Sequence, residues 1–236
     1  LQLNDNYLEG TIPQELGDLA LLSTLRLQNN FFEGVIPTTL GFLDKLSTID
    51  LSRNKLSGEI PDLITTMSSL RVLDLSLNAL TGTLPITWGA MDNLEELYVQ
   101  HNKLSGTIPN SLGLCTSLLR LSLGNNDLTG SIPTSIGSLE RLVTLNLLNN
   151  DISGTLPAGL YQCKQLQIIS FSNNDITGSI DAAIGQLTQL RKLIIKSNKR
   201  EGTLPSQLGQ ITTLKTIDVS NNKLTGGIPT TINSLA

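Results

Sequence analysis

The side chains best suited to chemistry in this 236-residue chain are few and scattered. There is one histidine, His101, and there are two cysteines, Cys115 and Cys163. Nucleophilic catalysis needs a serine or cysteine within hydrogen-bond reach of a base, and the sequence places none beside His101. No histidines and cysteines have zinc-site spacing, and no glycine-rich segment has the pattern of a phosphate-binding loop. The sequence therefore predicts no enzyme, no metal site and no cofactor.

Charge and composition exclude further classes. The net charge is −4 and the isoelectric point is about 5.0, which argues against a nucleic-acid-binding protein. No run approaches the roughly 18 apolar residues that span a bilayer, so we expect no membrane contact within this segment. Hydrophobic residues make up 39% of the chain, which is ample for an ordered core.

The element that positions every side chain is a repeat. Asparagines recur every 24 residues without insertion or deletion, at Asn6, Asn30, Asn54, Asn78, Asn102, Asn126, Asn150, Asn174, Asn198 and Asn222. Residues 46–61, LSTIDLSRNKLSGEIP, show the frame around one of them. A fixed period of this length is typical of a solenoid in which each repeat stacks on the next.

With each asparagine counted as zero, positions −5 and −3 are apolar and their neighbours are polar, as in Leu25 and Leu27. This alternation predicts one short half-buried strand per repeat over positions −5 to −2, stacked into a parallel sheet. Apolar residues at +2 and +6 are expected to complete the core. The asparagine should bind backbone groups that the turn after the strand leaves unpaired.

Glycine and proline also recur at fixed positions of the repeat. Glycine occupies position +4 in all ten repeats, which suits a positive φ, and proline occupies +7 in nine. Proline removes a backbone donor and hinders a full α-helix. The side opposite the sheet should therefore carry short extended or 3₁₀ segments.

The frame LxxLxLxxNxLxGxIPxxLGxLxxL resembles the plant-type leucine-rich repeat of receptor-like kinase ectodomains, receptor-like proteins and polygalacturonase-inhibiting proteins. The resemblance implies an α/β solenoid, a right-handed superhelix with a parallel β-sheet on the concave face and short extended or 3₁₀ segments on the convex face. It implies one domain, residues 1–236, with ten repeats. The first and last repeats are incomplete and uncapped, which we interpret as a fragment of a longer chain. The family implies an extracellular or cell-surface location.

The two cysteines do not predict a disulfide. Both occupy position +13, two repeats apart, so about 10 Å should separate them. We expect buried free thiols that act as small apolar side chains. The chain also contains no Asn-x-Ser/Thr sequon.

The candidate binding surface is the exposed face of the sheet, at positions −6, −4, −2 and −1. Aromatic and charged side chains meet there, as in a peptide or protein recognition patch. An ordinary solvated face is the alternative. The predicted ligand-binding residues are Arg26, Gln28, Asp50, Arg53, Asp74, Glu96, Tyr98, Gln100, His101, Ile194 and Lys196. Asp50 and Asp74 also fit an Asp-Leu-Ser consensus of the repeat.

Repeat nine is unusual. It concentrates five basic residues, Arg191, Lys192, Lys196, Lys199 and Arg200. Arg200 replaces the apolar residue at +2, and Asp181 replaces the proline of the preceding repeat. A charge in a core column is costly, so we expect the frame to be loosened there. The basic patch would suit an acidic partner or a polyanionic sugar, unless it is simply a solvated face.

A hydroxyl ladder follows position +5, where the ten residues are Thr11, Val35, Glu59, Thr83, Thr107, Ser131, Thr155, Ser179, Thr203 and Gly227. A regular ladder on a flat face could match a repeating lattice such as ice or a polysaccharide. Val35 and Glu59 interrupt it. The family that the chain resembles also often has Ser or Thr at this position.

Together these patterns predict a non-enzymatic module that binds a protein or peptide on its concave or lateral face, in the ectodomain of a cell-surface receptor-like protein or kinase. A co-receptor or a larger assembly would be a further partner. The alternatives are a soluble inhibitor of a secreted cell-wall hydrolase and a structural scaffold subunit.

Overall fold

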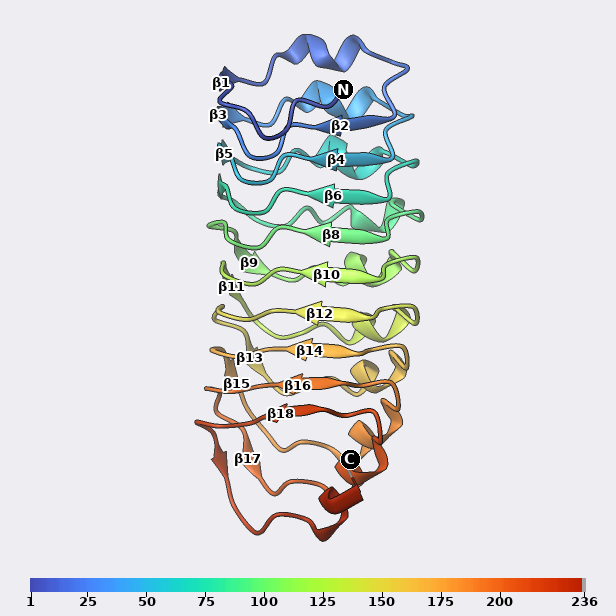
Figure 1. The fold of residues 1–236 in the computed structure, drawn as a ribbon, viewed down its shortest axis with the longest axis vertical. Helices are drawn as coiled ribbons and strands as arrows, with labels where there is room; N and C mark the ends of the chain where they lie inside the picture. The colour runs from blue at the N-terminus through green and yellow to red at the C-terminus, as the bar shows by residue number, and fades with distance from the viewer. Residues whose placement is uncertain (235–236) are drawn as a thin grey trace.

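The structure, a computed structural model, describes residues 1–234, so the predicted domain end at Ala236 lies outside the described residues. The chain forms a stack of coils, and each coil after the first adds one strand to a nine-stranded parallel sheet (Figure 1). The strands in chain order are β2 (Thr24–Arg26), β4 (Thr48–Asp50), β6 (Val72–Asp74), β8 (Glu96–Tyr98), β10 (Arg120–Ser122), β12 (Thr144–Asn146), β14 (Ile168–Ser170), β16 (Lys192–Ile194) and β18 (Thr216–Asp218).

These strands cover positions −6 to −4, so they begin and end earlier than predicted. Hydrogen bonding between coils nevertheless continues beyond them: Leu51 N donates to Asp74 O at 2.8 Å and Arg53 N to Ser76 O at 3.0 Å. The residue at −1 has a left-handed φ near 55° throughout, for example in Arg53, and this turns the chain out of the sheet. The inward columns are confirmed, since Leu25 and Leu27 are at most 2% exposed.

The opposite side carries one 3₁₀ helix per coil, as predicted. These helices are η1 (Gln14–Asp18), η2 (Thr38–Phe42), η3 (Asp62–Thr66), η4 (Trp88–Ala90), η5 (Asn110–Leu114), η6 (Thr134–Ser138), η7 (Ala158–Gln162), η8 (Ala182–Gln186), η9 (Ser206–Gln210) and η10 (Thr230–Ser234). Extended prolines precede most of them, as Pro109 does before η5. Since proline fixes φ and has no N–H to donate, it suits the start of a short helix.

A second set of short parallel strands runs along one edge of the stack, at positions +1 to +5, and the sequence did not predict it (Figure 1). It comprises β1 (Glu9–Thr11), β3 (Phe31–Val35), β5 (Lys55–Gly58), β7 (Ala79–Leu80), β9 (Ser105–Thr107), β11 (Asp127–Thr129), β13 (Ser153–Gly154), β15 (Asp175–Ile176), β17 (Glu201–Gly202) and β19 (Lys223–Leu224). Here a residue pairs with the one 22 positions later, as Thr107 does with Thr129. We call these strands the lateral sheet.

The asparagines that recur every 24 residues, which we call the asparagine ladder, bind backbone groups as predicted. In Asn126, which is 7% exposed, Nδ2 donates to the carbonyls of Val99, Leu123 and Gly124 at 3.1, 3.0 and 3.3 Å. Its Oδ1 accepts a hydrogen bond from Leu104 N at 3.0 Å. One side chain therefore satisfies backbone groups of two neighbouring coils, which explains the invariant spacing.

The glycine column has two causes. Gly130 has a φ of 73°, as predicted, and a Cβ built on it would lie 2.8 Å from Thr107 Cγ2. Position +4 must therefore lack a side chain, because the threonine of the preceding coil occupies that space.

Both cysteines are free and buried, as predicted. Cys115 Sγ donates to Trp88 O and Cys163 Sγ to Ile136 O, each at 3.1 Å. Burial raises the pKa of each thiol to about 12, so both stay protonated at neutral pH.

The expected loosening at Arg200 is wrong. Arg200 is only 1% exposed, yet its backbone N donates to Asn222 Oδ1 at 3.0 Å, as in the other coils. The guanidinium donates to the carbonyls of Thr177, at 2.6 Å, and Ser179. Asp181, in place of proline, accepts from Ala183 N at 2.7 Å and caps η8. Backbone carbonyls thus bind both terminal nitrogens of the buried cation, while its Nε has no hydrogen-bond partner within residues 1–234, and burial lowers its pKa.

We predict that Arg200→Leu leaves the free energy of unfolding unchanged or raises it by up to about 2 kcal/mol, because apolar residues often replace buried charges without loss. Urea denaturation would measure this. Arg200→Ala, which leaves a cavity, should be less stable than either protein. A loss above about 1 kcal/mol in Arg200→Leu would mean that the two carbonyl bonds outweigh the desolvation of the guanidinium.

Candidate recognition surface

The exposed side of the nine-stranded sheet, here called the sheet face, brings four predicted residues into one row. Arg26 pairs with Asp50, Asp50 with Asp74, and Asp74 with Tyr98 on successive strands β2, β4, β6 and β8. Neighbouring strands lie about 4.8 Å apart, so these side chains are immediate neighbours. Arg26 is exposed and the other three are half-buried.

The two aspartates hold adjacent negative charges. Asp50 Oδ1 accepts from the N–H and hydroxyl of Ser52, at 3.1 and 2.7 Å, and Asp74 Oδ1 accepts from Ser76 N at 2.9 Å. These bonds give the Asp-Leu-Ser pattern a structural role. Burial, and to a lesser extent the charge of Asp50, raise the pKa of Asp74. A cationic group of a ligand would relieve this repulsion.

Tyr98 belongs to a small polar network. Its hydroxyl donates to Glu96 Oε2 at 3.0 Å, and Arg120 pairs with the other oxygen of Glu96. Burial and the Glu96 carboxylate raise the pKa of Tyr98 to about 12, so the phenol remains neutral. Arg120 was not among the predicted residues. The sequence did indicate the pair, because Arg120 and Glu96 both occupy position −6 in successive coils, and the strand register places them side by side.

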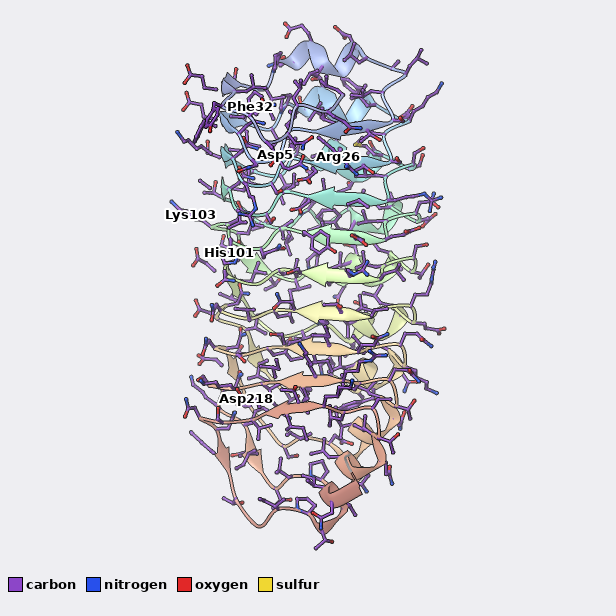
Figure 2. The ribbon with its side chains drawn as sticks, viewed as in Figure 1. Asp5, Arg26, Phe32, His101, Lys103 and Asp218 are labelled. Carbon is purple, nitrogen blue, oxygen red and sulfur yellow. The ribbon has the colours of Figure 1, made fainter. Side chains whose placement is uncertain are left out.

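The other predicted residues of these coils lie at the rim, where the chain leaves the sheet. Arg53 and His101 are exposed and have φ values of 55° and 58°. His101 Nε2 lies 3.3 Å from Asn125 Nδ2. Gln28 and Gln100 are half-buried, and within residues 1–234 their Oε1 atoms have no hydrogen-bond partner. Figure 2 labels Arg26 and His101 on this part of the molecule.

The rim also carries a second asparagine ladder, which was not predicted from the sequence. Asn149 Nδ2 donates to Asn125 Oδ1, and Asn173 Nδ2 to Asn149 Oδ1, each at 2.6 Å. All three asparagines have a left-handed backbone conformation, which asparagine adopts more readily than most residues do. The sequence contains a pattern that could have predicted this second ladder: Asn-Asn pairs recur at 125–126, 149–150 and 173–174, and the first asparagine of each pair lies on the rim.

Ile194 and Lys196 are separate from the first cluster. Ile194, on β16, lies four strands from Tyr98, or roughly 19 Å along the sheet. Its in-register neighbour is Asp218 on β18, whose pKa is lowered mainly by hydrogen bonds from Ser220. Apart from those at the rim, the predicted residues thus form two groups. We call the first the acidic cluster (Arg26, Asp50, Asp74, Glu96, Tyr98). The second, the basic group, is Ile194 and Lys196 together with Lys192, which was not among the predicted binding residues.

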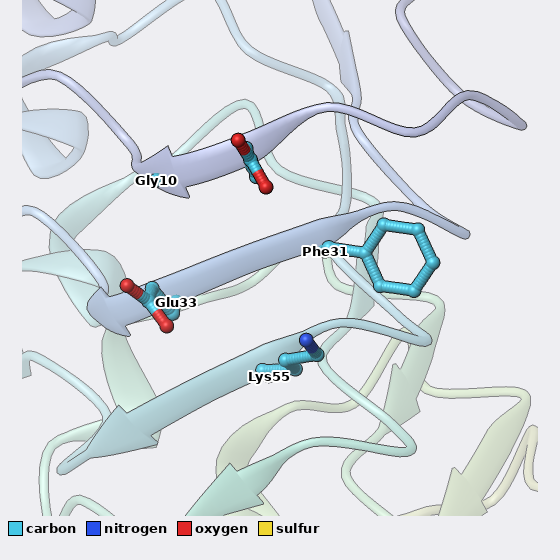
Figure 3. A pocket seen from close by; sticks show the side chains of 5 residues that line it. Gly10, Phe31, Glu33 and Lys55 are labelled. Atoms are coloured by element: carbon cyan, nitrogen blue, oxygen red, sulfur yellow. The ribbon is translucent and has the colours of Figure 1, made fainter.

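The lateral sheet has its own hollow, of about 490 Å³, at the N-terminal end (Figure 3). Glu9, Phe31, Glu33 and Lys55 line it, and Lys55 Nζ lies 4.9 Å from the centre of the Phe31 ring. Tyr7 stacks on Phe31 with ring centres 6.2 Å apart. The protein's own lysine therefore already covers this aromatic surface.

Residues 1–234 contain no group of three histidine, cysteine, aspartate or glutamate side chains placed to hold a metal ion. None of their helices is long and apolar enough to cross a bilayer.

A stack of similar coils, with one long parallel sheet, 3₁₀ turns opposite it and an asparagine ladder between, defines a solenoid repeat protein that displays an extended surface. Family models of the leucine rich repeat match residues 20–80, 44–104, 117–139, 141–163, 165–187 and 213–235. The chain belongs to the leucine-rich repeat family, whose repeat domains are typically non-catalytic.

Solved structures of plant receptor ectodomains are similar to this chain in fold and sequence. A TDR receptor matches 99% of this chain at 33% identity with a TM-score of 0.92, and the chain covers 45% of that receptor. The plant peptide hormone receptor RGFR1, in complex with RGF2, matches the whole chain at 30% identity with a TM-score of 0.73, with 46% of its own length covered. The chain thus spans less than half the length of both receptors.

A third solved structure belongs to a different functional class. A plant ice-binding protein matches 98% of this chain at 30% identity with a TM-score of 0.86, and 74% of its length is covered. No match was found among curated proteins.

Proposed function

We propose that the sheet face is a recognition surface for a peptide or protein, in an extracellular, non-enzymatic domain of receptor-like type. The single observation that carries this proposal is the in-register row Arg26–Asp50–Asp74–Tyr98, which gathers charge and an aromatic ring on a stiff sheet. A rigid surface loses little entropy on binding. Similarity to a peptide hormone receptor supports the same function.

The two groups on the sheet face suggest how a ligand is read. The acidic cluster presents Asp50 and Asp74 without an ion-pair partner within residues 1–234. The basic group lies five strands from Asp74, or about 24 Å along the sheet, a span that an extended peptide of about seven residues covers. We propose a ligand with cationic side chains over the acidic cluster and anionic ones over the basic group. A co-receptor or larger assembly would bind elsewhere on the solenoid.

We predict that the double variant Asp74→Ala/Tyr98→Ala binds peptides at least about tenfold more weakly, since interface aromatic and charged anchors carry most of the binding energy. Peptides would be selected from a displayed random library on the wild-type domain, and their affinities for both proteins would be measured by calorimetry. The melting temperature should fall by no more than about 4 °C.

The matched control is Asn146→Ala/Ser170→Ala, which changes two half-buried residues of the same sheet face between the two groups. It should keep most of the affinity. If selected peptides bind the Asp74→Ala/Tyr98→Ala variant as tightly as the wild type, the acidic cluster is not the binding site.

A second candidate function is ice binding. The similarity to a plant ice-binding protein supports it, and so does a specific observation on this chain: exposed Ser and Thr side chains recur along the lateral sheet with the period of the coils. This surface is separate from the sheet face, so the two functions do not compete for the same residues.

A further inference from the structure

We infer that the ice-binding surface of this protein is a two-column hydroxyl array on the lateral sheet; the inference rests on the second candidate function above. The array consists of five consecutive Ser/Thr-Gly-Ser/Thr segments, which begin at Thr81, Ser105, Thr129, Ser153 and Thr177. It therefore contains ten hydroxyl side chains, at positions +3 and +5, of which only the +5 column was expected from the sequence.

The strand register places the +5 residue of one coil beside the +3 residue of the next, so that the two columns form a two-dimensional net. Thr83 lies beside Ser105, Thr107 beside Thr129, and Ser131 beside Ser153 on neighbouring coils. Parallel strands lie about 4.8 Å apart, and residues two apart along a strand are separated by about 6.6 Å. The hydroxyls thus repeat in two directions, as the water oxygens of a crystal surface do.

The glycines between its columns keep the net closely packed from coil to coil. A Cβ atom at Gly106 or Gly130 would collide with the methyl group of Thr83 or Thr107, at 2.9 and 2.8 Å respectively. Each methyl group is therefore seated over a glycine of the next coil, which fixes a χ1 that is already stiff in threonine. No side chain rises between the columns.

Hydrogen bonding leaves the array open to water. Four of the five +3 hydroxyls donate to the glycine carbonyl of the preceding coil, as Ser105 does to Gly82 at 3.2 Å and Thr177 to Gly154 at 3.1 Å. Their lone pairs remain free to accept. The +5 hydroxyls of Thr83, Thr107 and Thr155 make no side-chain hydrogen bond among residues 1–234, so each can donate and accept.

The composition of the array favours ice over a soluble ligand. It contains no aromatic ring and no charge with which to select a particular chemical group. Glu59 ends it on one side and Glu201 on the other, and charged residues at +1, such as Lys103 and Asp127, border it. A single hydrogen bond to water is worth little, so only simultaneous contact with many ordered waters gives useful affinity.

The test measures the partition of fluorescently labelled protein into a slowly growing ice hemisphere. The wild-type domain should enter the ice. Thr107→Lys, which raises a long charged side chain in the middle of the array, should lower the fraction in ice by about tenfold or more, because it lifts the surrounding hydroxyls off the lattice. Thr107→Val, which removes only the hydroxyl, should lower it less.

The matched control is Ser138→Lys, an equal change at an exposed residue of η6. It should partition as the wild type does, and circular dichroism should show all variants folded. If the wild type is excluded from ice, ice binding fails and this inference with it, while peptide recognition on the sheet face is untouched. If the wild type enters ice and Thr107→Lys enters equally, ice binding stands and the assignment to this array is overturned.

Discussion

Replacing Asn126 by alanine should lower the free energy of unfolding by about 1–3 kcal/mol, although the substitution removes only a small polar group. The side chain makes four hydrogen-bond contacts with backbone groups: the two hydrogens of Nδ2 are shared among three carbonyls, and Oδ1 accepts from one N–H. Without it, the N–H of Leu104 and the carbonyl of Val99 lose their partner in the interior. An unpaired buried polar group carries its full desolvation penalty.

Asn126→Asp separates the two halves of this interaction. A carboxylate could still accept from Leu104, but it would lie about 3.0–3.3 Å from three carbonyl oxygens to which asparagine donates. The loss at neutral pH should therefore reach about 3–5 kcal/mol, the range for an uncompensated buried charge. Since the folded state raises the pKa of this aspartate, stability should recover as the pH falls and the carboxyl becomes protonated.

Urea denaturation at pH 7 and at pH 4 measures both effects. The control is Asn125→Gly, next along the chain, half-buried on the rim and at a φ of 56°, which glycine accepts. It should change stability by about 1 kcal/mol or less. An Asn126→Ala variant as stable as this control would show that the ladder contributes no net stability.

Leu123→Ala should cost about 2–5 kcal/mol by leaving a cavity between two coils. Leu123 is fully buried, at position −3 of the inward column. Its neighbours belong to adjacent coils that are held in register by the asparagine ladder, so the cavity cannot easily collapse. Denaturant titration at 25 °C gives the free energy directly.

A matched leucine serves as the control. Leu148 is half-buried at position −2, on the sheet face, and Leu148→Ala should cost less than about 1 kcal/mol. A loss below about 1 kcal/mol for Leu123→Ala, or equal losses for both variants, would contradict the assignment of the inward column.

Much of the fold could be predicted because the repeat makes each local pattern decisive. Alternation at Leu25 and Leu27 placed the strands, and glycine at +4 placed a positive φ. The lateral sheet was missed because its register, offset by 22 residues, depends on how each coil bends back. The hydroxyl at +3 becomes meaningful only when Thr129 is seen beside Thr107.

The candidate site was less predictable. Neighbours within the row, such as Asp50 and Asp74, followed from the repeat period alone. The pair Glu96–Arg120 joins side chains whose rotamers no sequence pattern determines. Arg200 was misjudged for a related reason: the carbonyls of Thr177 and Ser179 are free to solvate a cation, and only the folded structure shows that the guanidinium reaches them.

Successive coils are joined by the same hydrogen-bond pattern, since the repeated asparagine of each coil binds backbone groups of its predecessor, as Asn30 does with Leu3 and Asn222 with Ile195. If one whole 24-residue unit is deleted or duplicated, the coils on either side should therefore form the same hydrogen bonds. The protein should fold with a different length. Genetic gain or loss of such units would stretch or shorten both surfaces by one increment at a time, so that their reach can evolve without any redesign of the interior.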